Sequence, residues 1–527
     1  MHEGRTWKRL VTLPVRGDLI AGVSVALVLV PQSMAYAELA GLDPVHGLYV
    51  AAVAPLAGAL IGSSPYLQTG PVAVTSLLTL GALSGLADPF TARFAALAAL
   101  LAIVVGVIRL AVGIVGAGPI AYLMSQPVVA SFTSAAAVLI VASQVPSLLG
   151  VAAEGGNPAV AAAAVLGSPQ DWRFVDVLLG LGAIALVLGG RLLSAVFPGA
   201  LVAVVAASGW SAVTGYDGRM VGDIRVGLGL HLDLPFGDLG QLLIPGLIIA
   251  LVGFAEPASI ARRYAAEDRR PWNSNREFLG QGLANLAAGV ADGYPAGGSF
   301  SRTALNRLSG ARSRWSGAIT GAAVLALLPV AGLLAPLPSA VLAGLVIAAA
   351  ISLIDVRPIL RYWRWSRPQF MVALATAVAT IGLAPHVERG VLLGVAMALA
   401  VHLWRELSVG VPSQLKGDAL HLWPTGVLYF GSAPSLERTV NELVAAHRDV
   451  TRIVIHMGGL GRVDLTGAIT LRDLAEDARA GGVVLEIRDA GPHAARLLTR
   501  VLGDLSTVTL TRQGETAAEP EGKGTQD

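Results

Sequence analysis

The sequence contains no cysteine and few charged or aromatic residues. Charged side chains make up 14% of its 527 residues and aromatic ones 6%, whereas soluble domains carry about 25% charged residues. The lack of cysteine excludes disulfides and thiolate metal sites. Hydrophobic residues make up 54% of the chain, and the mean hydropathy is +0.66. This composition excludes an ordinary soluble protein.

Apolar stretches of near membrane-spanning length recur from about residue 17 to about residue 409. The chain is therefore expected to be a polytopic α-helical membrane protein in contact with a lipid bilayer. The pattern predicts about fourteen transmembrane helices, at residues 17–40, 47–62, 70–86, 93–115, 127–150, 174–192, 196–214, 240–260, 277–292, 299–311, 315–335, 338–354, 369–384 and 387–408.

The placement of basic residues predicts the orientation. They gather in the N-terminal segment 1–16, in the link after the eighth predicted helix and after the twelfth, whereas the connector 215–239 carries four aspartates. Because arginine and lysine concentrate on the cytoplasmic side, both termini are expected in the cytoplasm, with the chain in the cell membrane. Topology explains these clusters, so they give no indication of a nucleic-acid partner.

Beyond Val409 the chain is no longer apolar throughout. Three short strand-like runs alternate with two segments of helical spacing between residues 414 and 513, which predicts a small α/β domain. Residues 514–527 are rich in glycine and acidic residues and are expected to form a disordered tail.

Four predicted helices are interrupted where a simple membrane anchor would be regular. If the chain divides into halves at 17–214 and 240–409, the interruptions fall in the first and third helices of each half. They are Pro31-Gln32-Ser33, Gly70-Pro71, Glu256-Pro257 and Gly297-Gly298. Matched interruptions in two halves are typical of a transporter site built from inverted repeats.

Two of these interruptions predict helix starts that face one point. A helix start carries unpaired N–H groups and a partial positive charge, and Arg302 adds a full charge close to one start. Such a place suits a small anion. In the alternative interpretation, Arg302 lies in a cytoplasmic loop as one more positive-inside anchor.

Glu256 is a candidate for proton coupling. It lies in an apolar run with no basic residue before Arg262. A carboxylate withdrawn from water tends to take up a proton, which suits a proton relay. Glu38, near the end of the first predicted helix, is a second candidate that could equally be a wetted carboxylate.

Several motifs resemble the sulfate permease (SulP) family of anion transporters. They are Asp18-Leu19-Ile20-Ala21-Gly22, Pro31 to Ala37, Ala40-Gly41-Leu42, Gly47-Leu48-Tyr49, Gly70 to Val74, Gly253 to Glu256 and Phe300 to Ala304. Val463 to Ala468 resembles the strand-to-helix turn of the STAS domain that this family carries at its C-terminus. The resemblance implies a core and a gate domain made of two inverted seven-helix repeats, an elevator-like movement, and a homodimer.

The resemblance also implies a substrate site between the third and tenth helices. Its residues here would be Val72, Ala73, Ser301 and Arg302, with Gln32 and Tyr36 of the first helix closing the pocket. Backbone N–H groups of residues 72–73 and 301–302 and the Arg302 guanidinium would meet the anion. Sodium-coupled members carry an aspartate where Glu256 stands and a threonine one turn later, where this chain has Ile260. That departure favours protons over sodium.

The STAS-like turn departs from the phosphorylation-switched pattern as well. Leu465 stands where such domains have a serine, although Thr466 keeps a hydroxyl nearby. A regulatory role and a role in folding or dimer contact both stay open. Gly458 to Gly461 lacks the spacing of a nucleotide-binding loop, so no nucleotide is assigned.

The leading hypothesis is a secondary transporter for a small inorganic or organic anion of the sulfate, bicarbonate or dicarboxylate class, coupled to protons. The alternatives are an anion channel or exchanger without cation coupling, and an anion sensor that reports through the STAS domain. No nucleophile–base pair, paired carboxylates or metal-ligand cluster occurs at useful spacing. The chain is therefore not expected to be an enzyme, and no cofactor or metal is predicted.

Overall fold

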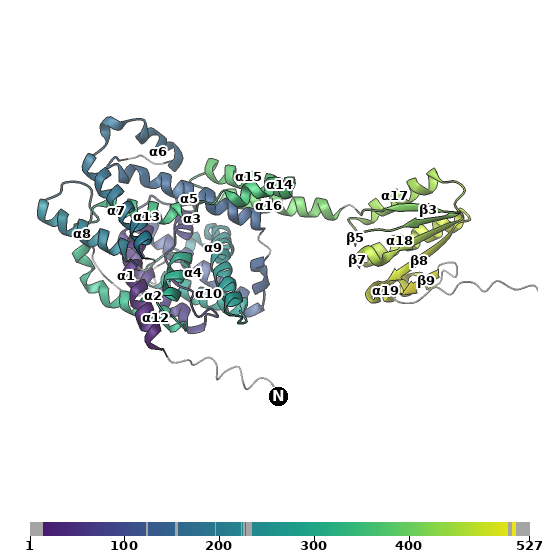
Figure 1. The fold of residues 1–527 in the computed structure, drawn as a ribbon, viewed down its shortest axis with the longest axis horizontal. Helices are drawn as coiled ribbons and strands as arrows, with labels where there is room; N and C mark the ends of the chain where they lie inside the picture. Colours follow the sequence, from purple (N-terminus) through teal and green to yellow (C-terminus); the bar gives the residue numbers. More distant parts are fainter. Residues whose placement is uncertain are drawn as a thin grey trace, which may run out of the picture. The chain divides into compact units, whose positions relative to one another are not determined.

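The computed structural model describes residues 14–122, 125–152, 156–194, 197–222, 224, 227, 234–407, 409–503 and 509–512. Most of the predicted N-terminal segment, parts of the connector 215–239 and the predicted tail lie outside these residues. The chain divides into two compact units, 1–398 and 399–527. Figure 1 shows the helices of the first unit and the strands and helices of the second.

The helices of the first unit follow the predicted order. In the first half they are α1 (Arg16–Leu39), α2 (Pro44–Ile61), α3 (Ala73–Leu83), α4 (Ala92–Val115), α5 (Gln126–Leu148), α6 (Pro158–Leu166), α7 (Phe174–Leu193) and α8 (Gly199–Thr214). In the second half they are α9 (Leu239–Glu267), α10 (Ser274–Val290), α11 (Phe300–Leu308), α12 (Trp315–Leu327), α13 (Ser339–Ile351), α14 (Arg357–Trp365), α15 (Arg367–Gly382) and α16 (Val387–Glu406). The short helices α6 and α14 were not predicted.

Seven helices of the described chain are long and apolar enough to cross a membrane by length and composition: α1, α2, α4, α5, α9, α12 with the turn that follows it, and α16. The helices α3, α8 and α13 are apolar but shorter, as is most of α7. The chain is thus a multi-pass membrane protein. The count of fourteen crossings and the inverted repeats stay predictions.

Two of the four predicted interruptions are breaks in the helix and two are not. The helices α3 and α11 each begin just after a two-residue strand, β1 (Thr69–Gly70) and β2 (Gly297–Gly298). By contrast, α1 continues through Pro31 and α9 through Pro257. The prediction that these two helices are broken was wrong, because a packed membrane helix tolerates the loss of one backbone hydrogen bond at proline.

The helix α9 also extends beyond its predicted end at residue 260. It continues to Glu267, and Arg263 donates to the Glu267 carboxylate one turn later at 3.0 Å. Such a pair supports an exposed helical turn that is too polar to be recognised as part of an apolar span.

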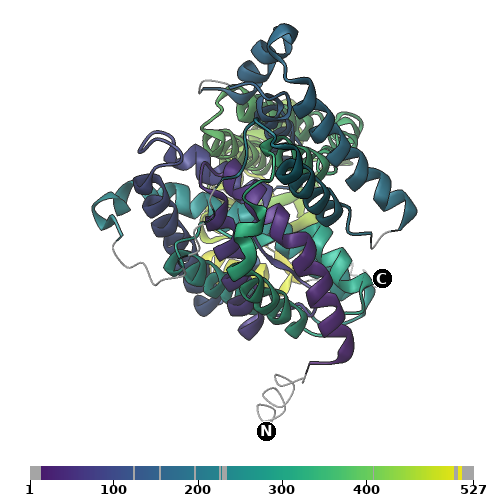
Figure 2. The ribbon, with the colours of Figure 1, turned by 90° about the vertical axis from the view of Figure 1, so that its left-hand side faces the viewer.

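The helices pack in two groups that each combine both halves of the chain. In one group α10 packs against α4 and α2, and α12 packs against α1 and α2, while α9 lies against α3 and α4. In the other group α13 packs against α5 and α7, and α15 against α5. Figure 2 shows α1, in purple, running through the first group. The strands β1 and β2 and the helices that follow them contact the first group.

Arg109 of α4 is fully buried and joins three segments of the chain. Its Nε and Nη2 donate to the carbonyls of Ala250 at 3.1 Å and Ile249 at 3.2 Å in α9, and its Nη1 donates to the Ala296 carbonyl at 2.9 Å. Asn285 of α10 holds the same Ala296, since its Oδ1 accepts the N–H at 2.9 Å. These bonds position β2, which begins at the next residue.

The second unit contains the predicted small α/β domain. A five-stranded sheet has the order β3 (Ser413–Lys416), β4 (Ala419–Leu422), β6 (Arg452–His456), β8 (Val484–Ala490) and β9 (Thr509–Arg512). Only β3 is antiparallel to its neighbour within this sheet. The strands β5 (Gly426–Leu428) and β7 (Leu460–Val463) form a separate parallel pair, and the helices are α17 (Ala433–Ala446), α18 (Leu465–Ala480) and α19 (Pro492–Leu502).

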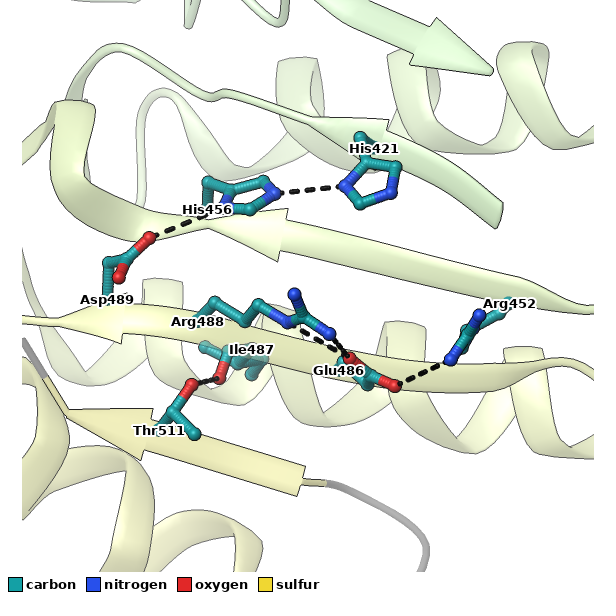
Figure 3. Close-up of polar contacts among 8 residues, drawn as sticks. All are labelled: His421, Arg452, His456, Glu486, Ile487, Arg488, Asp489 and Thr511. Atoms are coloured by element: carbon teal, nitrogen blue, oxygen red, sulfur yellow. Dashed lines mark hydrogen bonds and ion pairs between the residues drawn. The ribbon is translucent and has the colours of Figure 1, made fainter. Parts of the chain in front are cut away.

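Polar side chains form two bonded groups on one face of this sheet. Alternate residues of β4, β6 and β8 contribute to the hydrophobic core, so the remaining ones face the other side. There His456 lies between His421, with 3.0 Å between the ring nitrogens, and Asp489, at 3.3 Å (Figure 3). Arg452 and Arg488 both pair with Glu486 on the same face.

We predict that Arg109→Met lowers the thermal stability of the full chain in detergent micelles. Each hydrogen bond from a charged group contributes about 1.5–3 kcal/mol, and relief of the buried charge offsets part of the loss of three. A net loss on the order of 3 kcal/mol is expected. The exposed Arg93 of the same helix pairs with Asp238 at 3.6 Å, so Arg93→Gln is a matched control that should change stability by less than about 0.5 kcal/mol. Equal losses of thermal stability in the two variants would contradict the proposal that the hydrogen bonds of Arg109 stabilise the fold.

The C-terminal unit should lose stability as the pH falls. Burial and the nearby charges of His456, Lys416, Arg488 and Arg452 lower the pKa of His421. Between that lowered pKa and the ordinary value of about 6.5, the unfolded chain binds more protons than the folded one. The free energy of unfolding therefore decreases as the pH decreases. Hydrogen exchange in β4 and β6, corrected for its intrinsic pH dependence, should therefore accelerate from pH 7.5 to pH 5.5. His421→Gln should weaken this acceleration, while the exposed control His493→Gln should retain it. An unchanged pH response in His421→Gln would exclude His421 as its source.

Candidate functional site

The strands β1 and β2 join the two halves of the chain at the starts of two helices. They pair antiparallel, with Thr69 opposite Gly298 and Gly70 opposite Gly297. The pairing continues for one more bond, because the Ser299 N–H donates to the Gln68 carbonyl at 3.0 Å. Since α3 and α11 begin within three residues of these strands, the pairing holds the two helix starts side by side.

The second strand requires glycine because neighbouring side chains lie against its backbone. A Cβ atom at Gly298 would lie 2.8 Å from Leu67 Cδ1 and 3.0 Å from a Pro257 ring carbon. At Gly297 it would lie 2.9 Å from Val72 Cγ2. The glycine pair thus permits the close approach of β2 to β1 and to α9.

The start of α3 has no side-chain cap. Its N-cap residue is Val72, whose side chain cannot accept a hydrogen bond. The hydroxyls of Thr75 and Ser76 donate to the Val72 carbonyl, at 3.1 and 3.0 Å. The N–H groups of the first helical turn, which have no partner within a helix, therefore receive no acceptor from these side chains.

The start of α11 is capped from two sides. The Ser299 hydroxyl accepts the Arg302 N–H at 3.4 Å, and Glu256 Oε1 of α9 accepts the Phe300 N–H at 3.2 Å. A carboxylate at this position complements the positive end of the helix. The Arg302 N–H, predicted to face the anion, is thus used within the cap, so what Arg302 offers a ligand is its side chain.

The guanidinium of Arg302 is buried beside β1. Arg302 is 1% exposed, and none of its three side-chain nitrogens has a hydrogen-bond partner in the part of the chain that the structure describes. A Cβ atom at Gly70 of β1 would lie 3.6 Å from its Nη2. Glu256, Tyr36 of α1 and Tyr294 lie close enough to interact with it electrostatically. A buried guanidinium without acceptors is costly, so this place favours an acidic ligand.

A cavity of about 230 Å³ borders Arg302. Gln32 of α1 and Ser301 of α11 also line it, together with residues of α7 and α8. Gln32 is buried, and its Oε1 has no hydrogen-bond partner in the described chain. The Ser301 hydroxyl lies 3.3 Å from that of Ser299. Three of the predicted site residues therefore share one cavity.

The remaining predicted residues lie elsewhere around Arg302. Val72 and Glu256 line a separate cavity of about 30 Å³, and Ala73 is buried in the hydrophobic core. Val72 and Ala73 can therefore take part through their backbone, at the uncapped start of α3. Glu38 has Arg219 and Asp43 as charged neighbours, whereas Glu256 has Arg302, so of these two acids Glu256 is the neighbour of Arg302.

Sequence reasoning missed Tyr294 and Gly70 as neighbours of the guanidinium. Tyr294 is fully buried and lies three residues before β2. The signal that could have identified it is the Tyr294-Pro295 step directly before the glycine break. Gly70 was recognised as a helix-start signal, but its contact with Arg302 depends on the pairing of β1 with β2.

Comparison with known proteins gives consistent results over nearly the whole chain. The sulfate permease family model matches residues 15–376, and the STAS domain model matches residues 413–506. A protein of Mycobacterium tuberculosis named "Probable sulfate transporter" is 37% identical over 396 residues, which are 74% of this chain and 70% of that protein. Probable sulfate transporter 4.2 of Arabidopsis thaliana is 30% identical over 528 residues, 92% of this chain and 77% of that protein.

Solved structures show the same fold. The murine Solute Carrier 26 family member A9 anion transporter has a TM-score of 0.86 at 20% identity, over 96% of this chain and 92% of that one. The transmembrane domain of the cyanobacterial bicarbonate transporter BicA has a TM-score of 0.63 at 26% identity, over 73% of this chain and 98% of that one. Together with the two family models, these likenesses show that the chain belongs to the sulfate permease family of anion transporters and carries a STAS domain.

Proposed function

We propose that this chain is a secondary active transporter that carries a small oxyanion across the cell membrane together with protons. The observation that carries the proposal is the buried Arg302 guanidinium, which has no protein partner among the described residues. The anion would bind at this guanidinium, against the uncapped start of α3, with Gln32, Tyr36 and Ser301 around it. Similarity to proteins named sulfate transporters and to a bicarbonate transporter domain supports a small oxyanion as the substrate.

Glu256 connects the site to proton coupling. Its carboxylate interacts electrostatically with Arg302 and accepts the Phe300 N–H at 3.2 Å. When an anion binds at Arg302, two negative charges share one guanidinium, and uptake of a proton by Glu256 removes their repulsion. Anion binding and protonation therefore favour each other by the same free energy. Ile260, one turn along α9, offers no oxygen for sodium.

The two packing groups of the helical unit suggest how the site changes sides. The starts of α3 and α11 belong to the group built around α1, α2, α4 and α10. Residues of α7, which is in the other group, and of α8, which packs against α7, also line the cavity. In our proposal, the first group is the core that moves with the anion and the second is the gate against which it moves. The gate would form a homodimer, with both termini and the STAS domain in the cytoplasm.

Arg302→Met should abolish anion uptake into proteoliposomes without destabilising the protein. Loss of a buried charge contact to an anion weakens binding by about 2–5 kcal/mol, or roughly 30-fold or more. Arg302 has no hydrogen-bond partner in the described chain. The thermal stability of the Arg302→Met protein in anion-free buffer should therefore not fall, in contrast to that of Arg109→Met. Uptake of [35S]sulfate and [14C]bicarbonate and thermal unfolding test this together. Normal uptake of both would refute the proposed site, whereas a large loss of stability would show that Arg302 is structural.

Glu256→Gln should uncouple transport from the proton gradient. The amide can still accept the Phe300 N–H, so the cap of α11 is kept, but it cannot take up a proton. We expect anion exchange to persist while acceleration of uptake by an inward proton gradient disappears. The matched control is Glu38→Gln, which should keep this acceleration. An undiminished response to the gradient in Glu256→Gln would exclude Glu256 as the coupling residue.

A further inference from the structure

A second polar cavity lies among the links between helices of the first packing group. Its volume is about 210 Å³. Three links contribute to it: residues 62–66 after α2, residues 268–272 between α9 and α10, and residues 312–314 before α12. It shares no lining residue with the cavity at Arg302. The cavity is therefore a separate feature, on the side that the basic links predict to be cytoplasmic.

Four arginines line this cavity. They are Arg270, Arg276, Arg312 and Arg314. Arg276 and Arg314 converge on one atom, since each donates to the Gly62 carbonyl at 3.4 Å, and Arg276 also donates to the Ile61 carbonyl at 3.1 Å. Burial lowers the pKa of Arg314, and the positive charge of Arg276 lowers it further. Like charges are thus held together here by backbone carbonyls.

The nearby carboxylates are engaged with other donors. Asp268, which lines the cavity, accepts the Tyr66 hydroxyl at 2.6 Å and Arg307 at 2.8 Å. Glu277 accepts the Ser64 N–H at 2.8 Å and Trp272 Nε1 at 3.1 Å.

A third acid, Asp18, accepts the backbone N–H groups of Arg312 and Ser313, at 2.7 and 2.9 Å. Within the described chain, no carboxylate lies within salt-bridge distance of the guanidinium of Arg270, Arg276 or Arg312. Among the described residues, the guanidinium groups of Arg270, Arg276 and Arg312 are therefore not paired directly with a carboxylate.

We propose that this cavity is a second oxyanion site, which binds a sulfate or phosphate group between the arginines. Guanidinium groups match such oxyanions through paired N–H donors. Ser64, Tyr66 and Trp272 also line the cavity, and its volume exceeds that of a bare oxyanion. The bound group is therefore either a free oxyanion or the phosphate of a small phosphorylated molecule that also contacts the rings.

The position of the cavity gives binding a consequence. Its three links join α2 to β1, α9 to α10 and α11 to α12. One bound anion would therefore hold together segments that flank both helix starts of the Arg302 site. Occupancy would stiffen the first packing group from one side of the membrane. This inference does not depend on transport at Arg302, because it concerns different residues.

The test is equilibrium binding of [35S]sulfate and [32P]phosphate to the full chain in detergent, in the Arg302→Met background, which removes the other proposed site. We expect one saturable site per chain that weakens as salt rises. Arg270→Gln with Arg312→Gln should raise its dissociation constant about tenfold or more. These two side chains carry no hydrogen bond or ion pair in the described structure, so the variant should fold. Arg276→Gln should act in the same direction.

The matched control is Arg269→Gln, which removes an exposed charge from the same link without touching the cavity. It should leave binding within about twofold. Displacement by AMP or glucose 6-phosphate at lower concentration than by inorganic phosphate identifies a phosphorylated ligand, whereas equal displacement identifies a free oxyanion. No saturable binding in the Arg302→Met background, or equal binding in the Arg270/Arg312 variant and the Arg269→Gln control, would overturn the proposal.

Discussion

The antiparallel pairing of Thr69–Gly70 with Gly297–Gly298 is the constraint on which the candidate site depends. Neither α3 nor α11 is long enough to cross a membrane by itself, and a helix that starts within the membrane leaves backbone groups there whose burial is costly. The short pairing satisfies part of that backbone and brings together starts more than two hundred residues apart in sequence. Arg109 and Asn285 stabilise the pairing through their hydrogen bonds to Ala296, the residue before β2.

Two arginines that are fully buried among the described residues, Arg109 and Arg302, show the difference between a structural charge and a candidate functional one. The Arg109 guanidinium donates hydrogen bonds to three backbone carbonyls, whose dipoles stabilise its positive charge. Arg302 is buried equally well but has no such acceptor in the described chain. A fold that retains a guanidinium without hydrogen-bond acceptors carries a desolvation penalty that an acidic ligand can relieve. The free energy of that relief is then available for binding.

Much of this arrangement follows from the sequence, and the rest depends on contacts distant in the chain. Gly70-Pro71 and Gly297-Gly298 mark helix starts because glycine and proline limit the local backbone, and that signal is legible without a structure. Pro31 and Pro257 gave the same local signal, but their helices are continuous because tertiary packing decides whether a proline breaks a membrane helix. Arg109, in the apolar run of α4, gave no motif at all. Its role became visible only when α9 and β2 were placed beside it.

The hydrogen bond between Glu256 and the start of α11 suggests how anion binding at the site would depend on protonation of Glu256. In the anion-free site the Glu256 carboxylate is the nearest negative charge to Arg302 that the described residues provide, and it also occupies the positive end of the helix. An incoming oxyanion needs that same positive potential. Electrostatics then favours two states of the site. In one an anion is bound and Glu256 is protonated, and in the other no anion is bound and Glu256 is ionised. In the proposed mechanism, a carrier restricted to these two states would move one proton with each anion, so coupling would follow from competition for one guanidinium and would require no separate relay.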